Sequence, residues 1–211
     1  MELAVAVMSV AGAITLGAMS PGPSFVMVAR TALAVSRRDG LAAALGMGIG
    51  GTLFALAALV GLHLVLASVP ALYAAVKLLG GGYLIYLGCR IWGSAGLPLA
   101  VVEPEPAEQP GALWRSLLLG LGTQLSNPKT AIVDASVFIA LLPREVPLWV
   151  VLILPPTVLS IEAGWYSVVA LALSARAPRA LYMRSRRWID RAAGGVMVLL
   201  GVKLLADMRH V

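Results

Sequence analysis

Charged residues are scarce in this chain. Asp, Glu, Lys and Arg make up 12% of its 211 residues, whereas they make up about 25% of an ordinary soluble domain. Hydrophobic residues make up 60%, and a globule of this size would have too few polar residues to cover them. This composition excludes a disordered chain, a secreted disulfide scaffold and a soluble enzyme, and it indicates an integral membrane protein.

Cysteine and the common catalytic motifs are also missing. Cys89 is the only cysteine, so no intrachain disulfide, no cysteine-based metal site and no membrane thiol-redox carrier can form. The chain has no His-x-x-x-His pair, no Gly-x-Ser-x-Gly elbow and no phosphate-binding loop. We therefore expect no enzyme activity, no metal site and no cofactor. Without a nucleotide site, any pumping must use an ion gradient.

Six apolar runs are long enough to cross a membrane, which takes about 20 residues. They cover residues 3–29, 41–66, 71–91, 113–142, 147–172 and 188–206. The first run has no basic region before it and no Ala-x-Ala site after it, so we expect a retained span and not a cleaved signal peptide. The fold expected is an all-α integral membrane protein with six transmembrane helices.

The basic residues predict how these spans are oriented. The only acidic, proline-rich stretch, residues 101–110, is typical of an aqueous linker. With six spans, eleven arginines lie on the same side as this linker, in or beside the loops 1–2, 3–4 and 5–6, and four basic residues lie on or near the other side. The positive-inside rule then places these three loops in the cytoplasm and both termini outside. Topology and anionic lipid headgroups explain the arginines better than a nucleic-acid partner does.

The two halves of the chain resemble each other. Residues 20–25 match residues 126–131 at an offset of 106, and the glycine pattern of 81–90 matches that of 194–203 at an offset of 113. Three spans per half is an odd number, so the second copy must be inverted relative to the first. We expect one transporter domain over 1–211, made of repeat one (1–92), a cytoplasmic linker (93–112) and repeat two (113–211).

Prolines interrupt the first and fourth runs at equivalent positions. Pro21, Pro23 and Pro128 each remove a helix hydrogen bond and should open the helix. Opened helix ends can bind the charged ends of a substrate, and they are tolerated at membrane depth only where they line a cavity or are covered by protein. A single break would be a simple kink, but two equivalent breaks favour a site. The candidate substrate-binding residues are Ser20, Pro21, Gly22, Pro23, Asn127, Pro128 and Lys129.

Ionisable side chains inside the spans are the candidates for ion coupling. Glu162 lies well inside the fifth run, where it must pair, be hydrated or take up a proton, because a low dielectric disfavours a charge. Lys129 could be its structural ion-pair partner or could instead balance a substrate carboxylate. Asp134 follows Lys129 by five residues, which is not the same helix face, so the spacing leaves a direct pair open. Glu162 and Asp134 are the candidate ion-coupling residues.

Several motifs together resemble the LysE/RhtB family of amino-acid exporters. They are Ser-Pro-Gly-Pro at 20–23, the glycines of 40–50, the segment 77–88 that ends in Tyr-Leu-Ile-Tyr-Leu-Gly, and Ser-Asn-Pro-Lys at 126–129. The resemblance covers nearly the whole chain. It implies a bacterial inner-membrane secondary exporter that moves amino acids or similar small metabolites by proton antiport. It also implies Glu162 as the coupling carboxylate, with Lys129 and the two breaks as substrate contacts.

Asp134 departs from the family pattern, in which this residue is usually apolar or aromatic. An extra carboxylate would favour a cationic substrate or pair with a basic residue. Since Asp134 and Glu162 are oxygen ligands, a divalent metal-ion exporter is the alternative function, although Lys129 would repel a cation. A non-transporting partner of a complex is disfavoured because the loops are too short for a docking domain. The expected partners are a small-molecule substrate, protons and membrane lipid; small-residue helix faces would also permit a homodimer.

Overall fold

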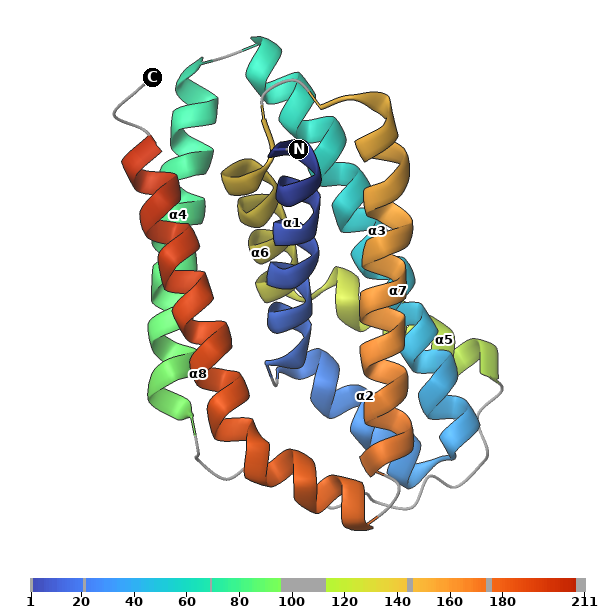
Figure 1. The fold of residues 1–211 in the computed structure, drawn as a ribbon. Coiled ribbons are helices and arrows are strands. Elements are labelled where there is room, and N and C mark those ends of the chain that lie inside the picture. The colour runs from blue at the N-terminus through green and yellow to red at the C-terminus, as the bar shows by residue number, and fades with distance from the viewer. Residues whose placement is uncertain are drawn as a thin grey trace.

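The computed structural model describes residues 2–20, 22–68, 70–95, 113–143, 146–173 and 176–207. Within these ranges the chain is all-helical, as the composition and the apolar runs predicted. The helices, shown in Figure 1, are α1 (Glu2–Met19), α2 (Pro23–Ala34), α3 (Arg37–Ser68), α4 (Pro70–Ser94), α5 (Leu113–Leu125), α6 (Pro128–Leu141), α7 (Leu148–Leu173) and α8 (Arg176–Ala206).

Two breaks interrupt the helices where the prolines predicted them. The first separates α1 from α2, and the second separates α5 from α6. Pro23 and Pro128 each begin a helix, a position where the missing N–H of proline has no helical partner to lose. The side chain of Asn127 caps α6, because its Oδ1 accepts a hydrogen bond from the backbone N–H of Lys129 at 3.0 Å. Pro21 lies outside the described residues.

The helices run between two ends of a bundle. Helix α1 begins and α8 ends at the upper end of Figure 1, whereas α2, α4 and α7 finish at the lower end. Three helices of the described residues have segments long and apolar enough to cross a membrane, namely Glu2–Met19, Arg37–Gly61 and Leu148–Ala172. These helices indicate a multi-pass membrane protein. The count of six spans stays a prediction.

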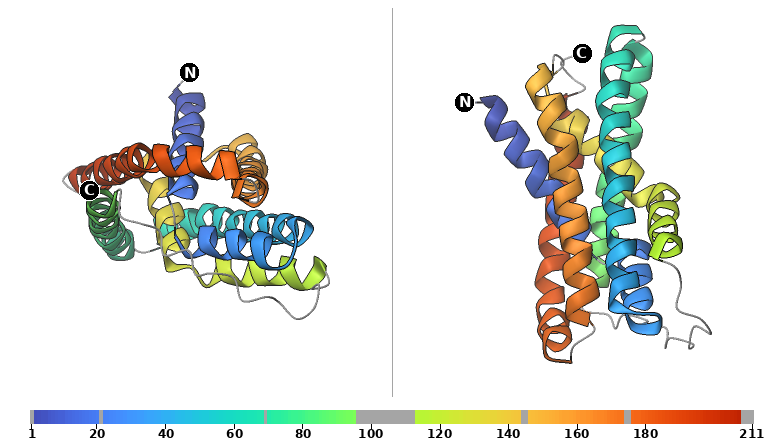
Figure 2. Two further views of the ribbon diagram at one scale, coloured as in Figure 1. Left: turned by 90° about the horizontal axis from the view of Figure 1, so that it is seen from below. Right: turned by 90° about the vertical axis from the view of Figure 1, so that its right-hand side faces the viewer.

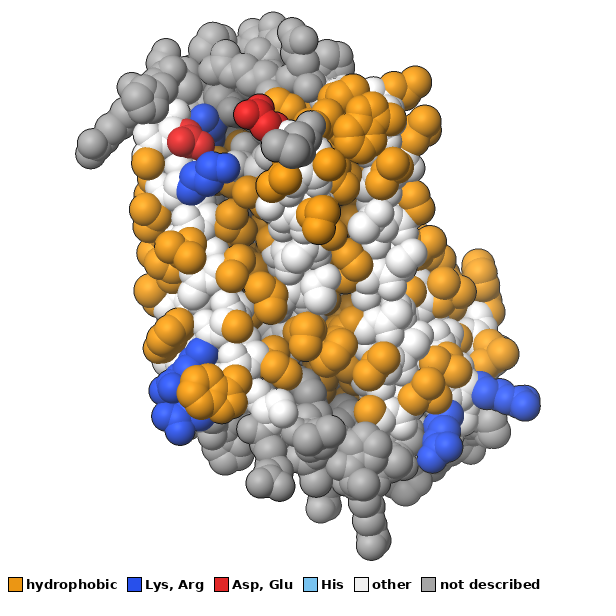
Figure 3. Space-filling model, in the orientation of Figure 1, with side chains coloured by type: hydrophobic (Ala, Val, Ile, Leu, Met, Phe, Trp, Pro, Cys, Tyr) orange, Lys and Arg blue, Asp and Glu red, His pale blue; other side chains and the backbone are white. Residues whose placement is uncertain are grey.

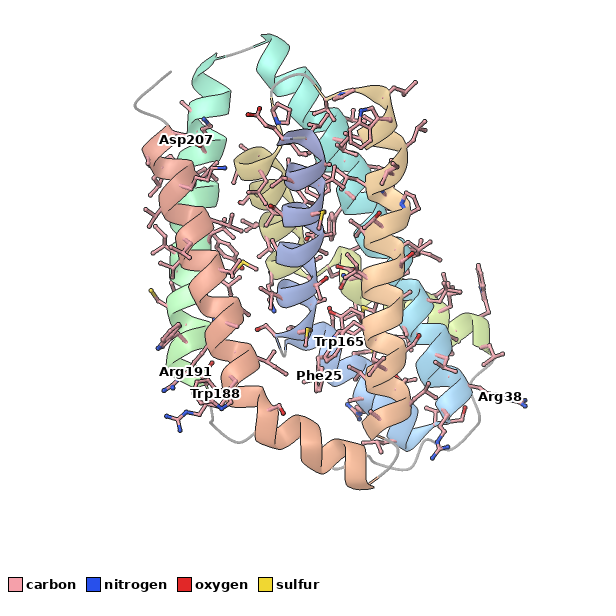
Figure 4. All side chains as sticks on the ribbon, viewed as in Figure 1. Phe25, Arg38, Trp165, Trp188, Arg191 and Asp207 are labelled. Carbon is pink, nitrogen blue, oxygen red and sulfur yellow. The ribbon has the colours of Figure 1, made fainter. Side chains whose placement is uncertain are left out.

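The outer surface carries large apolar side chains that face away from the bundle. Leu79, Leu152 and Leu199 are 72%, 64% and 70% exposed, and Figure 3 shows hydrophobic side chains over the middle of the visible face. Figure 4 places Arg38 and Arg191 at the lower end of the bundle. An apolar surface of this extent would be unstable against water, and it is the surface that a lipid bilayer accepts.

Glycines in α3 let two neighbouring helices approach it closely. A Cβ added at Gly46 would meet the backbone carbonyl of Leu117 in α5, and one added at Gly48 would lie 2.7 Å from the Cβ of Ala163 in α7. The same holds from the other side, where a Cβ on Gly120 of α5 would meet the backbone of Ala43. The glycine-rich stretch of α3 is therefore explained by tight helix packing.

Helices α4 and α8 pack in antiparallel directions through four glycines. A Cβ on Gly88 would lie 2.6 Å from the carbonyl oxygen of Gly194, and a Cβ on Gly201 would lie 2.6 Å from that of Gly81. These glycines carried half of the internal-repeat pattern. Close packing of the two helices requires them whether or not the halves are related, so this part of the pattern has a second explanation.

The arginine-rich segment between the fifth and sixth runs is helical, so the expectation of a loop there is wrong. Helix α8 begins at Arg176, well before residue 188, where the sixth span was predicted to start. Figures 1 and 2 show its first part crossing the lower end of the bundle before the helix turns toward the upper end. Arginine, alanine, leucine and methionine all favour helix, and counting charges alone does not reveal this.

Replacing Gly46 by alanine is expected to destabilise the bundle. The new Cβ would meet backbone atoms of α5, which no rotamer change can move, so the free energy of unfolding should fall by about 1–3 kcal/mol. The measurement is the thermal unfolding midpoint of the detergent-solubilised protein. Gly12→Ala in α1 is the matched control, since nothing lies within 4 Å of its new Cβ. Equal midpoints for the two variants would contradict this packing.

Candidate functional site

The two helix breaks meet at one small cavity inside the bundle. Its volume is about 20 Å³, which is enough for one water molecule and too small for an amino acid. Among the residues that line it are Ser20, Ser24, Asn127, Lys129, Asp134 and Glu162. The sequence predicted a site formed by both breaks and by α7, and the structure brings these parts together.

Two apolar clusters border this cavity. One contains residues from α2, α3 and α7, including Phe25, with Trp165 packed against it; Figure 4 shows both side chains near the α1–α2 break. The other joins α1, α3, α4, α6, α7 and α8 and includes Phe138. Ile14 of this second cluster and Tyr166 of the first both line the cavity. The polar site is thus surrounded by apolar packing.

Lys129 connects α6 to the end of α1. Its Nζ donates hydrogen bonds to the carbonyl oxygens of Gly17 at 3.2 Å and Ser20 at 3.0 Å. A positive charge is favourable there, because the last carbonyls of a helix carry the negative end of its dipole. The sequence left open a structural ion pair between Lys129 and Glu162. Among the described residues, Nζ donates hydrogen bonds to these two carbonyls and to no carboxylate.

A chain of hydrogen bonds joins both breaks to Glu162. Asn127 Nδ2 donates to Ser24 Oγ at 2.9 Å, and Ser24 Oγ donates to Gln124 Oε1 at 2.7 Å. Gln124 Nε2 then donates to Glu162 Oε2 at 2.6 Å. All four residues are buried, and every donor points in the same direction, toward the carboxylate. Such a chain is polarised along its length, so each bond strengthens the next.

The carboxylate of Glu162 is held in a narrow place between α3 and α5. Glu162 is 3% exposed, and a Cβ added at Gly51 of α3 would collide with its carboxylate group. Glycine at this position therefore makes the space that the carboxylate fills.

Asp134 and Ser20 both line this cavity, and each has an unpaired side-chain oxygen among the described residues. Both residues are 3% exposed and line the cavity. Asp134 Oδ2 and Ser20 Oγ have no hydrogen-bond partner among the described residues. The sequence spacing did not decide whether Lys129 and Asp134 form a direct ion pair. In the structure both residues line the cavity. The ammonium group of Lys129 donates its hydrogen bonds to the carbonyl oxygens of Gly17 and Ser20.

The other predicted substrate-binding residues have different positions. Gly22 lines the central cavity, and a Cβ there would lie 3.7 Å from Lys129 Nζ. Pro23 and Pro128 line a second hollow of about 470 Å³, with Leu118, Thr123 and Ser126. Asn127 lines both spaces. Pro23 and Pro128 therefore begin the helices after the breaks without lining the central cavity.

Three polar residues of this region were not predicted. Ser24 and Gln124 complete the hydrogen-bond chain, and an amide side chain at membrane depth is the signal that could have identified Gln124. Asp190 of α8 is 2% exposed, and its charge attracts that of Lys129. It lies inside the sixth predicted run, residues 188–206, so an ionisable side chain within a span is the signal that could have identified it.

Sequence comparison finds matches over most of the chain. A sequence profile of the family described as LysE type translocator matches residues 15–208. The threonine efflux protein of Escherichia coli (strain K12) is 33% identical over 190 residues, which cover 89% of this chain and 91% of that protein. The threonine efflux protein of Salmonella typhi is 32% identical over 191 residues, with 89% and 91% covered. An uncharacterised membrane protein of Haemophilus influenzae is 29% identical over 190 residues, 90% of each chain. No solved structure matches.

Proposed function

This chain belongs to the LysE type translocator family, and we propose that it exports amino acids or similar small metabolites from the cytoplasm by proton antiport. The observation that carries the proposal is the meeting of two broken helices, one ammonium group and two carboxylates at a single buried cavity. Broken helices that face a cavity at membrane depth are the arrangement by which secondary transporters bind small charged molecules.

The substrate that fits best is a small zwitterion such as threonine. The two threonine efflux proteins among the relatives support this choice. A zwitterion carries a carboxylate, which the amino-terminal ends of α2 and α6 attract through their dipoles. It also carries an ammonium group, which carboxylates attract. The residues proposed to contact it are Ser20, Pro21, Gly22, Pro23, Asn127, Pro128 and Lys129.

Glu162 is the proposed coupling carboxylate. When it is ionised, its bond from Gln124 is charge-assisted and roughly twice as strong as a bond between neutral groups. The chain then holds α2, α5, α6 and α7 together around the cavity. Protonation removes the charge at the end of the chain, which weakens every bond in it. The proton therefore shifts the equilibrium toward a state in which the breaks separate.

The proposed transport cycle uses two inverted halves, residues 1–92 and 113–211, joined by the linker 93–112, of which 96–112 lie outside the described residues. Each half contributes one broken helix to the cavity. We place the arginine-bearing end in the cytoplasm and both termini on the outer side of a bacterial inner membrane, following the positive-inside rule. Lipid contact and a homodimer stay predictions. A divalent metal-ion exporter is not favoured, because the relatives with a named cargo are threonine efflux proteins.

Transport in proteoliposomes tests this proposal. Vesicles containing the full chain are loaded in turn with single amino acids or with divalent metals, with and without a pH gradient. We expect threonine or a similar amino acid to leave about tenfold or more faster than from protein-free vesicles, and faster still with the gradient. Movement of metals alone, or of no solute, would contradict the proposed function. Amino-acid movement that ignores the gradient would contradict only the proton coupling.

A further inference from the structure

Two oxygen atoms in the cavity lack the partners that buried oxygens normally have. They are Asp134 Oδ2 and Ser20 Oγ, and both residues are 3% exposed. Buried polar atoms without a partner are rare in folded proteins, because each has lost its water without a replacement. An ionised carboxylate oxygen is satisfied by a hydrogen-bond donor or by a cation, and the hydroxyl oxygen of Ser20 accepts from a donor. The cavity therefore calls for a ligand that donates hydrogen bonds.

The other charged groups of the cavity do not supply that donor. The ammonium group of Lys129 already donates to the carbonyls of Gly17 and Ser20. Glu162 receives its bond from Gln124. The two carboxylates on the cavity outnumber the one ammonium group, so the site has a deficit of positive charge when both are ionised. A ligand that is both a donor and a cation removes the deficit and satisfies Asp134 at the same time.

The size of the cavity limits what this ligand group can be. A volume of about 20 Å³ takes one group of the size of a water molecule. A primary ammonium group has that size, carries a positive charge and has three donors, enough for Asp134 Oδ2 and Ser20 Oγ together. Building on the proposed export function, we propose that Asp134 and Ser20 form the subsite that binds an ammonium group of the transported molecule.

Two ammonium groups could occupy this subsite, the α-ammonium of any amino acid or the side-chain ammonium of a basic one. Asp134→Asn keeps the shape of the side chain but removes its charge. Ser20→Ala removes the hydroxyl. Ser136→Ala is the matched control, because Ser136 is a buried serine of α6 that does not line the cavity.

The measurement is how well an unlabelled compound inhibits counterflow of labelled threonine in each variant. The competitors are threonine, lysine and 2,3-dihydroxybutyrate, which has a hydroxyl in place of the α-ammonium of threonine. In the wild type we expect the dihydroxy acid to compete about tenfold or more worse than threonine. If the α-ammonium occupies the subsite, Asp134→Asn weakens competition by threonine about tenfold and leaves competition by the dihydroxy acid unchanged. The variant then no longer discriminates between the two compounds. If the side-chain ammonium occupies it, only lysine is weakened. Ser20→Ala shows the same pattern to a smaller extent, and Ser136→Ala shows none.

Several outcomes separate this inference from its premise. No amino-acid transport by the wild type would overturn the proposed function. Wild-type transport in which Asp134→Asn weakens competition by neither threonine nor lysine would overturn the subsite alone, and would mean that the two oxygens bind only water. Should Asp134→Asn fail to fold, Asp134→Glu replaces it, because this variant keeps the charge. We expect Asp134→Glu to retain the discrimination between threonine and the dihydroxy acid. A folded Asp134→Glu variant that binds threonine normally but no longer discriminates would also overturn the subsite.

Discussion

Glu162→Gln is expected to abolish the response of export to a pH gradient. Glutamine has the same shape and its Oε1 can still accept the hydrogen bond from Gln124, so the variant removes the titratable charge with little change in packing. Gradient-driven release of threonine from proteoliposomes should fall about tenfold or more. Counterflow at equal pH, which needs no proton, should continue. Driven release that keeps its rate and its pH dependence would show that Glu162 does not couple transport to protons.

Two further variants show whether this loss belongs to the Glu162 carboxylate. Gly51→Ala leaves the charge in place but puts a Cβ into the space that the carboxylate occupies, so it should also impair the pH response. Gly164→Ala in α7 is its control, because nothing lies within 4 Å of the new Cβ. Asp39→Asn is the control for loss of a buried carboxylate, since Asp39 accepts hydrogen bonds from Ser36 and Ser116 away from the cavity. It should leave the pH response unchanged.

The position of the breaks could be predicted from sequence because proline acts locally. A proline at the start of a helix fixes the end of the preceding one through its missing N–H and its ring, and both breaks are found at the prolines. A site formed by both breaks was predicted from the equivalence of the two halves, and Lys129 and Glu162 were predicted as part of it because ionisable residues inside apolar runs are usually functional. These inferences need only local chemistry and the order of the elements along the chain.

The hydrogen-bond chain could not be predicted, because it depends on how distant helices pack. Gly50 brings α5 close to α3, since a Cβ there would lie 2.7 Å from the Cβ of Gln124. The next residue, Gly51, makes room for the Glu162 carboxylate. Two neighbouring glycines therefore bring together an amide from α5 and a carboxylate from α7. In the sequence they are simply small residues of an apolar helix, and nothing in them identifies the two partners.

Lys129→Met is expected to abolish transport and to destabilise the protein. Without the ammonium group, the carbonyl oxygens of Gly17 and Ser20 lose their donor. The carboxylates on the cavity also lose their balancing charge, and removal of one partner from a buried set of charges costs about 3 kcal/mol. The measurements are threonine counterflow and the thermal unfolding midpoint. Counterflow at the wild-type rate would exclude Lys129 from the substrate site.

Loss of transport in this variant has two explanations, loss of a substrate contact or loss of structural charge balance. The double variant Lys129→Met/Glu162→Gln separates them, because it removes one positive and one negative charge and restores the net charge of the cavity. We expect its unfolding midpoint to recover toward that of the wild type while counterflow stays absent. Since Glu162→Gln alone is expected to keep counterflow, its continued absence would be due to the missing lysine. Recovery of counterflow along with stability would instead mean that Lys129 only balances charge.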